Sequence, residues 1–265
     1  MADTEPALSA RGLHMQYRDR KSGTSLVAIE TMDLDVGDGE FVSLLGPSGC
    51  GKSTFLKIVN GLLLGTAGEI RLRGDGKRRE DAMVFQDAAL FPWYSILDNV
   101  AYGLICAGVA RKEARRRAVP LIDLVGLSGF AERYPYQLSG GMQQRANLAR
   151  ALAVDSGILL MDEPFASLDA QTREVMQAEL LRIWNAAKKT VIFVTHQIDE
   201  AIYLSDRVVV MCARPGRIIA DIRIDLPRPR GLDVKRRPEF AGYADQIWKL
   251  LATHGVSVEA MPDPA

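Results

Sequence analysis

The sequence has few cysteines, no excess of either charge and no apolar run long enough to cross a bilayer. The three cysteines, Cys50, Cys106 and Cys212, are scattered and form no CxxC pair, which predicts reduced thiols in a cytosolic protein. The longest apolar runs, such as GILLM and RVVVMCA, are far shorter than the roughly 20 residues of a membrane helix. We therefore expect that the chain forms no membrane pathway by itself.

The net charge and the composition of the N-terminus further restrict the class of protein to which the chain can belong. The chain has 33 basic and 33 acidic side chains, so overall charge does not favour a nucleic-acid partner. The first residues, MADTEPALSARG, contain no apolar core, and we expect no signal peptide. With 265 residues, 48% of them hydrophobic, the chain is long enough for one large globular unit or two small ones with proper cores.

Short apolar runs alternate with helical patterns along the chain. The runs EFVSLLG, DAMVFQ, SGILLMDEP and TVIFVTH predict strands that are covered on both faces, as in a parallel sheet. Between them, KSTFLKIVNGLL and REVMQAELLRIWNAA have helical spacing. The residues expected on one face of the second helix are Val175, Leu180, Ile183, Trp184 and Ala187. The sequence thus predicts an α/β fold with active residues at the carboxyl ends of strands.

Two regions depart from this alternation. Residues 89–154 lack convincing strand patterns and are predicted to be a helical insertion. Within it, a helix should begin at Ser95, with Asp98 in capping-box spacing, and Pro120 should kink or restart a helix. The tail after Asp225, LPRPRGLDVKRRPEF, is rich in proline and arginine and is expected to be a connector to a short amphipathic piece.

Residues 46–53, GPSGCGKS, fit the pattern GxxxxGK[ST] between a predicted strand and a predicted helix. Glycines let backbone N–H groups turn inward around phosphate oxygens, and the helix N-terminus adds the positive end of a dipole. Lys52 supplies a charge for the outer phosphates, and the Ser53 hydroxyl can reach Mg²⁺. A glycine turn can match this pattern by chance, but the flanking strand and helix favour a nucleotide phosphate site.

Polar residues follow three of the other predicted strands. In ILLMDE, Asp162 is suited to anchor Mg²⁺, and Glu163 is suited to orient the attacking water and accept its proton. Paired acids after a strand are otherwise often a solvated turn, so this interpretation depends on the phosphate loop. His196 ends TVIFVTH and Gln86 ends DAMVFQ, and both are expected at the same sheet edge. Alone, either would be assigned a structural or solvated position.

A second stretch, LSGGMQQR at 138–145, also has the composition of a phosphate loop, although one nucleotide site needs only one. Together the motifs resemble the ATP-binding subunits of ABC transporters over nearly the whole chain, to about residue 225. GPSGCGKST resembles the Walker A loop, Gln86 the Q-loop glutamine and LSGGMQQR the signature motif. ILLMDE resembles Walker B, SLD at 167–169 the D-loop, and His196 the switch histidine.

The resemblance implies a P-loop NTPase (RecA-like) core with a mainly parallel sheet, an antiparallel β subdomain and a helical insertion subdomain. Residues 1–225 would be the nucleotide-binding domain, with the helical subdomain at about 89–154, and residues 226–265 a C-terminal extension. The cofactors it implies are ATP and Mg²⁺.

The resemblance also assigns site residues. The residues that it assigns to nucleotide binding are Tyr17, Gly46, Pro47, Ser48, Gly49, Cys50, Gly51, Lys52, Ser53, Thr54, Ser139, Gly140 and Gly141. The residues that it assigns to the metal are Ser53, Gln86 and Asp162. The residues that it assigns to catalysis are Lys52, Gln86, Glu163 and His196. Tyr17 occupies the place of an aromatic that stacks on adenine, although a single tyrosine can equally be a packing residue. Cys50, at a helix N-terminus beside Lys52, is expected to favour its thiolate.

The family pairs two such domains head to tail, which explains the second glycine motif. Ser139, Gly140 and Gly141 would then contact a γ-phosphate held by the partner copy. The other implied partners are transmembrane permease subunits and, indirectly, a solute-binding protein, which places the chain peripherally at the cytoplasmic face of the inner membrane. Phe91 and Trp93 lie either in the core of the insertion or in the permease groove. LFPW and LPRPR resemble the branch that imports nitrate, sulfonates and taurine.

Several alternatives remain at this point. A DNA-repair relative would carry a long coiled-coil insertion, and a translation-type relative would carry two nucleotide domains. A P-loop kinase would need neither LSGGMQQR nor Glu163, and a non-hydrolysing module would lack Glu163 or His196. An exporter often has its membrane part fused to this domain. The basic run Arg111 to Arg117 and the tail KRRP are either solvated faces or contacts to anionic lipid.

Overall fold

The computed structural model describes residues 5–18, 24–74, 81–86, 89–154, 156–166, 168–187, 189–213 and 215–254. The chain divides into two compact units. The first unit is Met1–Arg73 with Ile192–Ala265, and the second unit is Gly74–Val191. Across the described ranges, none of the helices combines the length and apolarity that a bilayer crossing requires.

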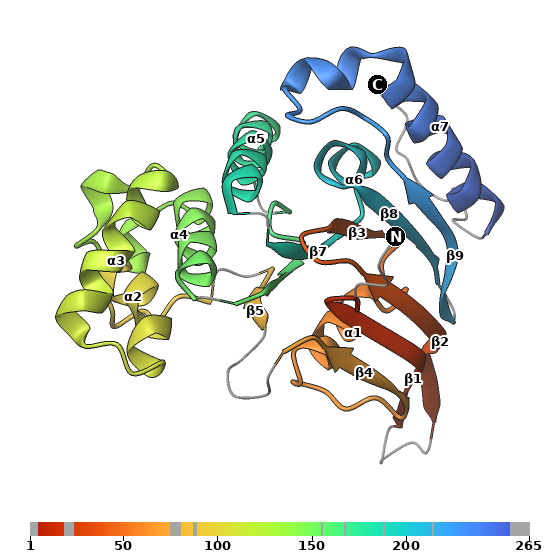
Figure 1. The fold of residues 1–265 in the computed structure, drawn as a ribbon, viewed down its shortest axis with the longest axis horizontal. Coiled ribbons are helices and arrows are strands. Elements are labelled where there is room, and N and C mark those ends of the chain that lie inside the picture. Colours follow the sequence, from red (N-terminus) through yellow and green to blue (C-terminus); the bar gives the residue numbers. More distant parts are fainter. Residues whose placement is uncertain are drawn as a thin grey trace. The chain divides into compact units, whose positions relative to one another are not determined.

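In the sheet of the first unit the strands follow one another in the order β4, β1, β2, β9, β8 and β3, and β7, which enters this unit at Ile192, lies next to β3 (Figure 1). The strands are β1 (Leu8–Arg18), β2 (Ser25–Val36), β3 (Phe41–Leu45), β4 (Ala67–Leu72), β7 (Thr190–Thr195), β8 (Arg207–Cys212) and β9 (Gly216–Arg223). Strand β1 pairs antiparallel with β2 and β4, and β8 pairs antiparallel with β9. The pairs β3 with β8 and β2 with β9 are parallel.

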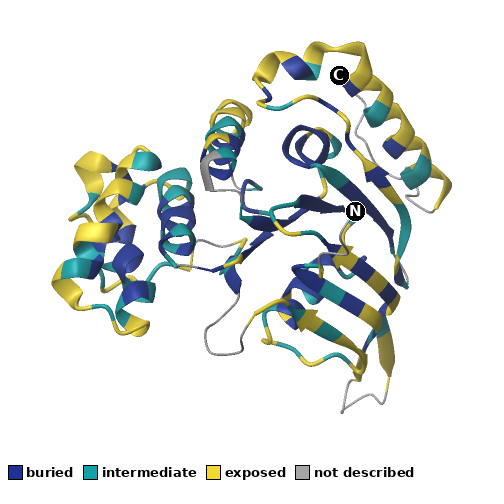
Figure 2. Ribbon diagram, viewed as in Figure 1, coloured by how far each residue is buried: buried dark blue, intermediate teal, exposed yellow. Residues whose placement is uncertain are grey.

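The burial of these strands follows their sequence patterns (Figure 2). All five residues of β3 are buried, and β8 buries all but its first residue, as continuous apolar runs predict. Strands β1 and β2 interleave buried and exposed residues, so one face of this antiparallel part is solvated. The buried parallel strands therefore form the part of the sheet from which the chain leads into the phosphate loop.

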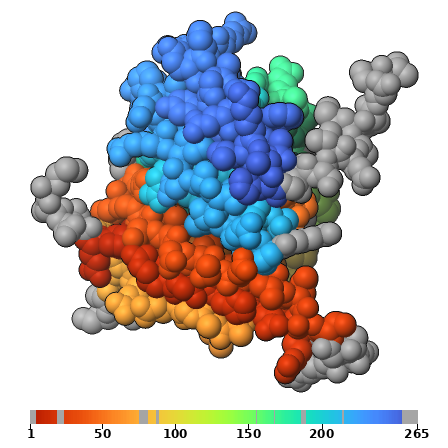
Figure 3. Space-filling view, turned by 90° about the vertical axis from the view of Figure 1, so that its right-hand side faces the viewer, coloured from red at the N-terminus to blue at the C-terminus, as the bar shows by residue number. Residues whose placement is uncertain are grey.

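In the described residues of the first unit the helices are α1 (Lys52–Val59), α6 (Ile198–Leu204), the short 3₁₀ helix η3 (Leu232–Arg236) and α7 (Pro238–Thr253). Helix α7 packs against α6 and buries Phe240 and Ile247. In the space-filling view the blue C-terminal residues form the surface above the red and orange N-terminal strands (Figure 3).

The predicted connector LPRPR is a packed part of the first unit. Arg230 is 6% exposed, and its guanidinium donates hydrogen bonds to the carbonyl oxygens of Ile202, Tyr203 and Ser205 at the end of α6. Burial lowers the pKa of Arg230 to about 10. Arg228 donates to Asp206 and to the Leu204 carbonyl. These bonds satisfy carbonyls that a helix C-terminus leaves unpaired, and they tie the C-terminal segment to α6.

The second unit joins two parallel strands, β5 (Asp81–Val84) and β6 (Ile158–Asp162), to a helical region. Its helices are α2 (Ile96–Cys106), α3 (Arg111–Leu124), η1 (Ser128–Phe130), η2 (Pro135–Gln137), α4 (Gly140–Ala153) and α5 (Ala170–Ala187). Helices α2, α3 and α4 pack on one another (Figure 1). Val100, Ala118 and Ala149, one residue from each helix, are fully buried in their common core. Residues 89–154 thus consist of helices and turns. The expected architecture of a mainly parallel sheet, an antiparallel part and a helical insertion is confirmed.

Three local predictions can be compared with the helices. Ser95 caps α2, accepting a hydrogen bond from the Asp98 N–H at 3.1 Å, as predicted. Helix α3 runs through Pro120 without restarting, because a proline forfeits one backbone bond while Ala118 and Ile122 keep the helix packed. Val175 was placed on the wrong face of α5, since it is 61% exposed while Leu180, Ile183 and Trp184 are buried. The side chain of Ala187 lies outside the described part.

Candidate nucleotide site

The phosphate loop connects the buried strand β3 to helix α1 in the first unit. Gly49 and Gly51 have φ values of 79° and 90°, which only glycine adopts without strain. Gly51 is the N-cap of α1 and makes no side-chain cap, and the N-terminus of this helix offers the positive end of its dipole to an anion. The glycines of the motif are therefore required by the backbone geometry of the loop.

Lys52 lies folded over this loop. Its side chain is buried, and its ammonium donates hydrogen bonds to the Gly46 carbonyl at 2.7 Å and the Pro47 carbonyl at 2.9 Å. A buried ammonium needs such acceptors, because desolvation without a partner is costly. The loop thus holds one positive charge against its own backbone, next to the N-terminus of α1.

A close backbone contact between the phosphate loop and the start of β9 fixes the position of the loop, and the sequence did not reveal it. A Cβ atom placed on Gly216, the first residue of β9, would lie 2.3 Å from the Cys50 carbonyl oxygen and 2.4 Å from the Ala28 carbonyl oxygen. A Cβ on Gly51 would lie 2.7 Å from the same Ala28 oxygen. Backbone therefore packs directly on backbone here, and strands β2 and β9 define the position of the loop.

We predict that Gly216→Ala weakens nucleotide binding by about tenfold or more, because overpacking costs about 1–3 kcal/mol and the nearest atoms belong to the loop backbone. Titration with a fluorescent ADP analogue measures the change. Gly129→Ala is the matched control, since a Cβ on Gly129 meets nothing within 4 Å. Equal affinity for the Gly216→Ala and Gly129→Ala proteins would contradict the prediction.

Tyr17 lies near the C-terminal end of β1 and is 40% exposed. Its hydroxyl is 3.3 Å from the Thr54 Oγ1 in the first turn of α1. The structure therefore brings Tyr17 to the phosphate loop, with part of its side chain open to solvent. Because it is partly exposed, Tyr17 is not simply a core packing residue.

Cys50 does not have the environment that the sequence suggested. Its side chain is fully buried, and burial raises the pKa of the Cys50 thiol, although Lys52 opposes that shift. The Lys52 ammonium lies 3.6 Å from the Cys50 Sγ, but it is already bonded to two carbonyls. The expectation of a reactive thiolate is wrong, because desolvation outweighs the nearby charge.

The corrected prediction concerns all three thiols. Under native conditions a maleimide should modify the exposed Cys106 and leave the buried Cys50 and Cys212 intact. Mass spectrometry of labelled peptides measures this, and Cys106→Ser protein should take up no label until it is denatured. Loss of ATPase activity in Cys106→Ser protein on maleimide treatment, with protection by Mg-ATP, would restore the original expectation for Cys50.

His196 also belongs to the first unit. It directly follows β7, which neighbours β3 in the sheet, and its side chain is exposed. Helix α6 begins two residues later, at Ile198. His196 thus lies in the turn that follows the strand next to the one leading into the phosphate loop.

In the second unit, β6 delivers the two acidic residues. Asp162, the last residue of the strand, is 6% exposed, and Glu163 follows with a φ of 44°. A residue other than glycine in the left-handed region costs about 1–3 kcal/mol, and such residues concentrate at functional sites. The backbone at Glu163 is therefore held in a conformation that local preference opposes.

Gln86 is exposed and follows β5, the strand that pairs in parallel with β6. Two buried side chains of α4, Gln144 and Asn147, donate hydrogen bonds to the Phe85 carbonyl beside it, each at 3.3 Å. Arg150, one turn further along α4, donates to the Ala89 carbonyl at 2.9 Å. Helix α4, which begins within the signature, thus holds the backbone on both sides of the candidate glutamine.

Ser139 is the N-cap of α4, accepting a hydrogen bond from the Met142 N–H at 3.4 Å. Ser139 and Gly140 are exposed, and a Cβ on Gly140 would meet nothing within 4 Å. Gly141 lies closer to the protein, because a Cβ there would approach the Leu168 side chain to 3.1 Å. The N-terminus of α4 therefore presents an open glycine-rich surface.

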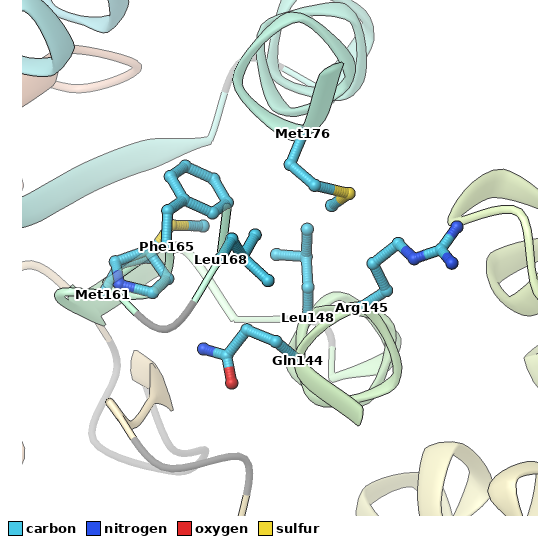
Figure 4. Close-up of a pocket in the computed structure, with 8 residues that line it drawn as sticks. Gln144, Arg145, Leu148, Met161, Phe165, Leu168 and Met176 are labelled. Carbon is cyan, nitrogen blue, oxygen red and sulfur yellow. The ribbon is translucent and has the colours of Figure 1, made fainter. Parts of the chain in front are cut away.

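The other side of α4 packs on the segment after Glu163. Figure 4 shows Leu148 directed toward Leu168 and Met176. The cavity among these side chains has a volume of about 10 Å³, at the lower limit for one water molecule. It is a packing defect and not a ligand site. Of the predicted D-loop, Asp169 caps α5 through the Thr172 N–H at 3.0 Å, and Ser167 lies outside the described residues.

Aromatic residues gather beside the candidate glutamine loop. The Phe91 ring lies 4.7 Å from Tyr102 and 5.6 Å from Trp93 between centroids, and the Arg150 guanidinium lies over it at 5.7 Å. Phe91 is half-buried, whereas Trp93 is 67% exposed. Trp93 is therefore a surface residue supported by an aromatic cluster. Of the two positions considered for it, the core of the insertion is excluded and a place at the surface is left.

The basic run at the start of α3 is largely neutralised within the second unit. Arg115 contacts Asp98 and Glu132, each at 2.8 Å, while Arg116 and Arg117 share Glu113. The two arginines lower the pKa of Glu113 to about 2. Exposed pairs of this kind contribute little to stability, but they offset part of the positive charge that anionic lipid would attract. The solvated alternative is favoured.

The candidate residues therefore fall into two sets. The first unit holds Tyr17, the phosphate loop from Gly46 to Thr54, and His196. The second unit holds Gln86, Ser139 to Gly141, Asp162 and Glu163.

Comparisons with known proteins agree with the motifs. The family model described as ABC transporter matches residues 29–166. An uncharacterised ABC transporter ATP-binding protein from Methanocaldococcus jannaschii is 50% identical over 233 residues, covering 87% of this chain and 86% of its own length. A taurine import ATP-binding protein from Roseobacter denitrificans is 43% identical, covering 92% of this chain and 93% of its own length. A solved dimeric ATP-binding cassette in a post-hydrolysis state with ADP and phosphate has a TM-score of 0.73 at 32% identity, covering 85% of this chain and all of its own.

Proposed function

The chain belongs to the ABC transporter family as an ATP-binding subunit with ATPase activity, and from this premise we propose that it powers a solute importer. Two copies pair head to tail, ATP binding closes the pair, and hydrolysis with phosphate release opens it. A separate membrane permease converts this motion into transport. A ligand that binds one conformation better than another shifts their populations, so ATP supplies the energy for closure.

The observation that carries the proposal is the presence of two glycine-rich helix N-termini on different units of one chain. Helix α1 begins at Lys52 after Gly51, and α4 begins at Gly140 with Ser139 as its cap. Both present backbone N–H groups suited to phosphate oxygens. On a single chain the second would compete with the first for one nucleotide, whereas on a partner copy it makes ATP part of the dimer interface.

The first unit binds the nucleotide in this proposal. The loop from Gly46 to Thr54 surrounds the phosphates, and Lys52 exchanges its two carbonyl partners for phosphate oxygens, which are charged and therefore stronger acceptors. The exposed part of Tyr17 stacks on the adenine ring. Ser139, Gly140 and Gly141 of the second copy contact the γ-phosphate.

Mg²⁺ fits the residues proposed for it. Ser53, Asp162 and Gln86 offer a hydroxyl, a carboxylate and an amide oxygen, which are the hard oxygen donors that Mg²⁺ prefers. When bound, the ion neutralises negative charge on the phosphates. Glu163 orients the attacking water and accepts its proton, and Gln86 and His196 contact the water and the γ-phosphate respectively.

The proposed solute is nitrate, a small sulfonate or a taurine-like compound, because taurine import proteins are 43–45% identical over 86–92% of this chain. A solute-binding protein delivers the solute to the permease, and this chain lies peripherally at the cytoplasmic face of the inner membrane, held by the permease. Nucleic acid has no part in the proposal.

Deletion of the gene in its source cell tests the direction and the solute. Uptake of labelled taurine, nitrate and an alkanesulfonate is measured before and after complementation with wild-type or Lys52→Ala protein. Loss of uptake of one solute, restored by the wild type alone, supports the proposal. Unchanged uptake of all three solutes contradicts the solute class, and accumulation of a solute in the deletion strain contradicts import.

Trp93 is proposed to contact the permease, because its exposed ring is supported by Phe91 and Tyr94. Trp93→Ala should leave ATP hydrolysis by the isolated subunit nearly intact and weaken pull-down of the permease by about tenfold, as expected for an aromatic anchor at an interface. Trp248→Ala is the matched control, since Trp248 is 58% exposed on α7. Normal pull-down by the Trp93→Ala protein would remove Trp93 from the interface.

A further inference from the structure

Two buried side chains fix the turn that contains His196. Thr195, the last residue of β7, is 1% exposed, and Glu200, in the first turn of α6, is 5% exposed. The Thr195 hydroxyl donates a hydrogen bond to the Glu200 Oε2 at 2.6 Å. The same hydroxyl accepts a hydrogen bond from the Gln197 N–H at 3.0 Å. The Thr195 side chain thus makes hydrogen bonds to two groups that follow His196 in the chain, the Glu200 carboxylate and the Gln197 N–H.

The hydrogen bonds at the start of α6 differ from those of an ordinary helix N-terminus. Gln197 is the N-cap of α6, but its own side chain makes no cap hydrogen bond. The Thr195 hydroxyl instead accepts a hydrogen bond from the N–H of this N-cap residue, which closes a turn from residue 195 to residue 197 with His196 at its centre. A hydroxyl has one donor hydrogen and two acceptor lone pairs, so it can serve both bonds at once.

The burial of Glu200 points to a specific requirement. Burying a carboxylate is expensive unless it is hydrogen-bonded, and aliphatic residues would fill the same space more cheaply. The distance of 2.6 Å is typical of a hydroxyl bonded to a charged acceptor, which is the stronger kind of hydrogen bond. Glu200 therefore fixes the rotamer of Thr195, and Thr195 fixes the backbone of the turn.

We propose that Thr195 and Glu200 are positioning residues for His196, holding its exposed imidazole in one orientation toward the γ-phosphate. The inference rests on the role of His196 in the proposed function. Helix α6 is also bound at its other end by Arg230, so the turn connects a buried strand to a helix fixed at both ends. His196 is exposed, but the residues on either side of it have little freedom to move.

The first test separates catalysis from binding. Thr195→Val keeps the branched shape that suits a strand but loses both hydrogen bonds, and kcat for ATP hydrolysis should fall by about 10-fold to 100-fold. KM for ATP should stay within about twofold, because the phosphate loop is untouched. Thr195→Ser, which retains the hydroxyl, should recover most of kcat. Thr190→Val is the control, since Thr190 is equally buried at the other end of β7.

A double-mutant cycle with His196→Ala decides whether the effect passes through His196. The Thr195→Val change should add no further loss to His196→Ala protein. A second loss of the same size would show a purely structural effect and overturn the proposal. Wild-type kcat for His196→Ala would instead refute the role of His196 in the proposed function. Reduced kcat for His196→Ala beside unchanged kcat for Thr195→Val would overturn the positioning inference alone.

A milder variant covers the case in which Thr195→Val does not fold. Glu200→Gln keeps the size and one acceptor oxygen but loses the charge, so kcat should fall by about threefold to tenfold with KM unchanged, and only when His196 is present. Circular dichroism verifies that each protein is folded. If the Thr195→Val protein is unfolded, the Glu200→Gln protein decides the outcome, and a wild-type kcat for it would overturn the proposal.

Discussion

Glu163→Gln protein is expected to bind ATP with wild-type affinity and to hydrolyse it about 10² to 10⁴ times more slowly, the usual cost of removing a positioned base. The amide has the size of the carboxylate but cannot accept the proton of the attacking water. Its backbone can adopt the same φ of 44° that the structure imposes on Glu163, so the loop after β6 should keep its shape. The change therefore isolates the chemistry of one carboxylate.

Two measurements establish this result. Single-turnover hydrolysis gives the rate of the chemical step, and size exclusion with ATP should show the variant accumulating as a dimer, since ATP still favours closure while hydrolysis no longer opens the pair. Glu132→Gln is the control, because Glu132 is an exposed partner of Arg115 on the same unit. Hydrolysis by Glu163→Gln within about twofold of wild type would exclude Glu163 as the base.

The motifs were predictable because their residue types follow from local chemistry. Gly49 and Gly51 have positive φ, and any sequence that wraps a strand-to-helix loop around phosphate needs glycine at such positions. The cap at Ser95 was equally local, since it depends on a hydroxyl three residues before an N–H. Such features are fixed by residues adjacent in sequence, and for them the pattern is sufficient.

The contacts that the sequence did not reveal join segments far apart in the chain. Gly216 is needed because the carbonyls of Cys50 and Ala28 lie against it, and its own neighbours in sequence give no sign of this. The sequence predicts Arg230 to be part of a connector, because its partners on α6, Ile202 and Tyr203, are 28 and 27 residues away in sequence. Proline and arginine in a row indicate a loop unless the carbonyls that the arginine caps are known.

Cys50 shows how a local rule fails when burial is unknown. A helix N-terminus and an adjacent lysine both favour a thiolate, and the sequence places Cys50 beside both. The structure buries the thiol completely and gives the Lys52 ammonium two carbonyl partners, so desolvation prevails and the pKa is raised. The sign of a pKa shift depends on the balance of these terms, and burial is a property of the whole fold.

The arrangement of the signature motif in the dimer can be tested with two inactive variants. Lys52→Ala removes the charge that neutralises the outer phosphates and disables the phosphate-loop side of a site. Ser139→Arg places a bulky cation where we propose that a small hydroxyl meets the γ-phosphate, and it should disable the signature side. Since Ser139 also caps α4, Ser139→Gly is compared with Ser139→Arg: this change costs only a few tenths of a kcal/mol as a cap and removes the hydroxyl without adding the bulk and charge of arginine.

A mixture of the two inactive variants is expected to regain one working site. In a head-to-tail dimer, the Lys52→Ala loop faces the Ser139→Arg signature, so both defects fall in one composite site and the other site is whole. Mixed dimers should then occlude about one ATP each, measured with labelled nucleotide after rapid gel filtration. Occlusion is the better readout, because hydrolysis can require two cooperating sites. Tagged pull-down shows whether mixed dimers form. If they form and trap no ATP, each site keeps one defect, and Ser139 serves the nucleotide of its own chain.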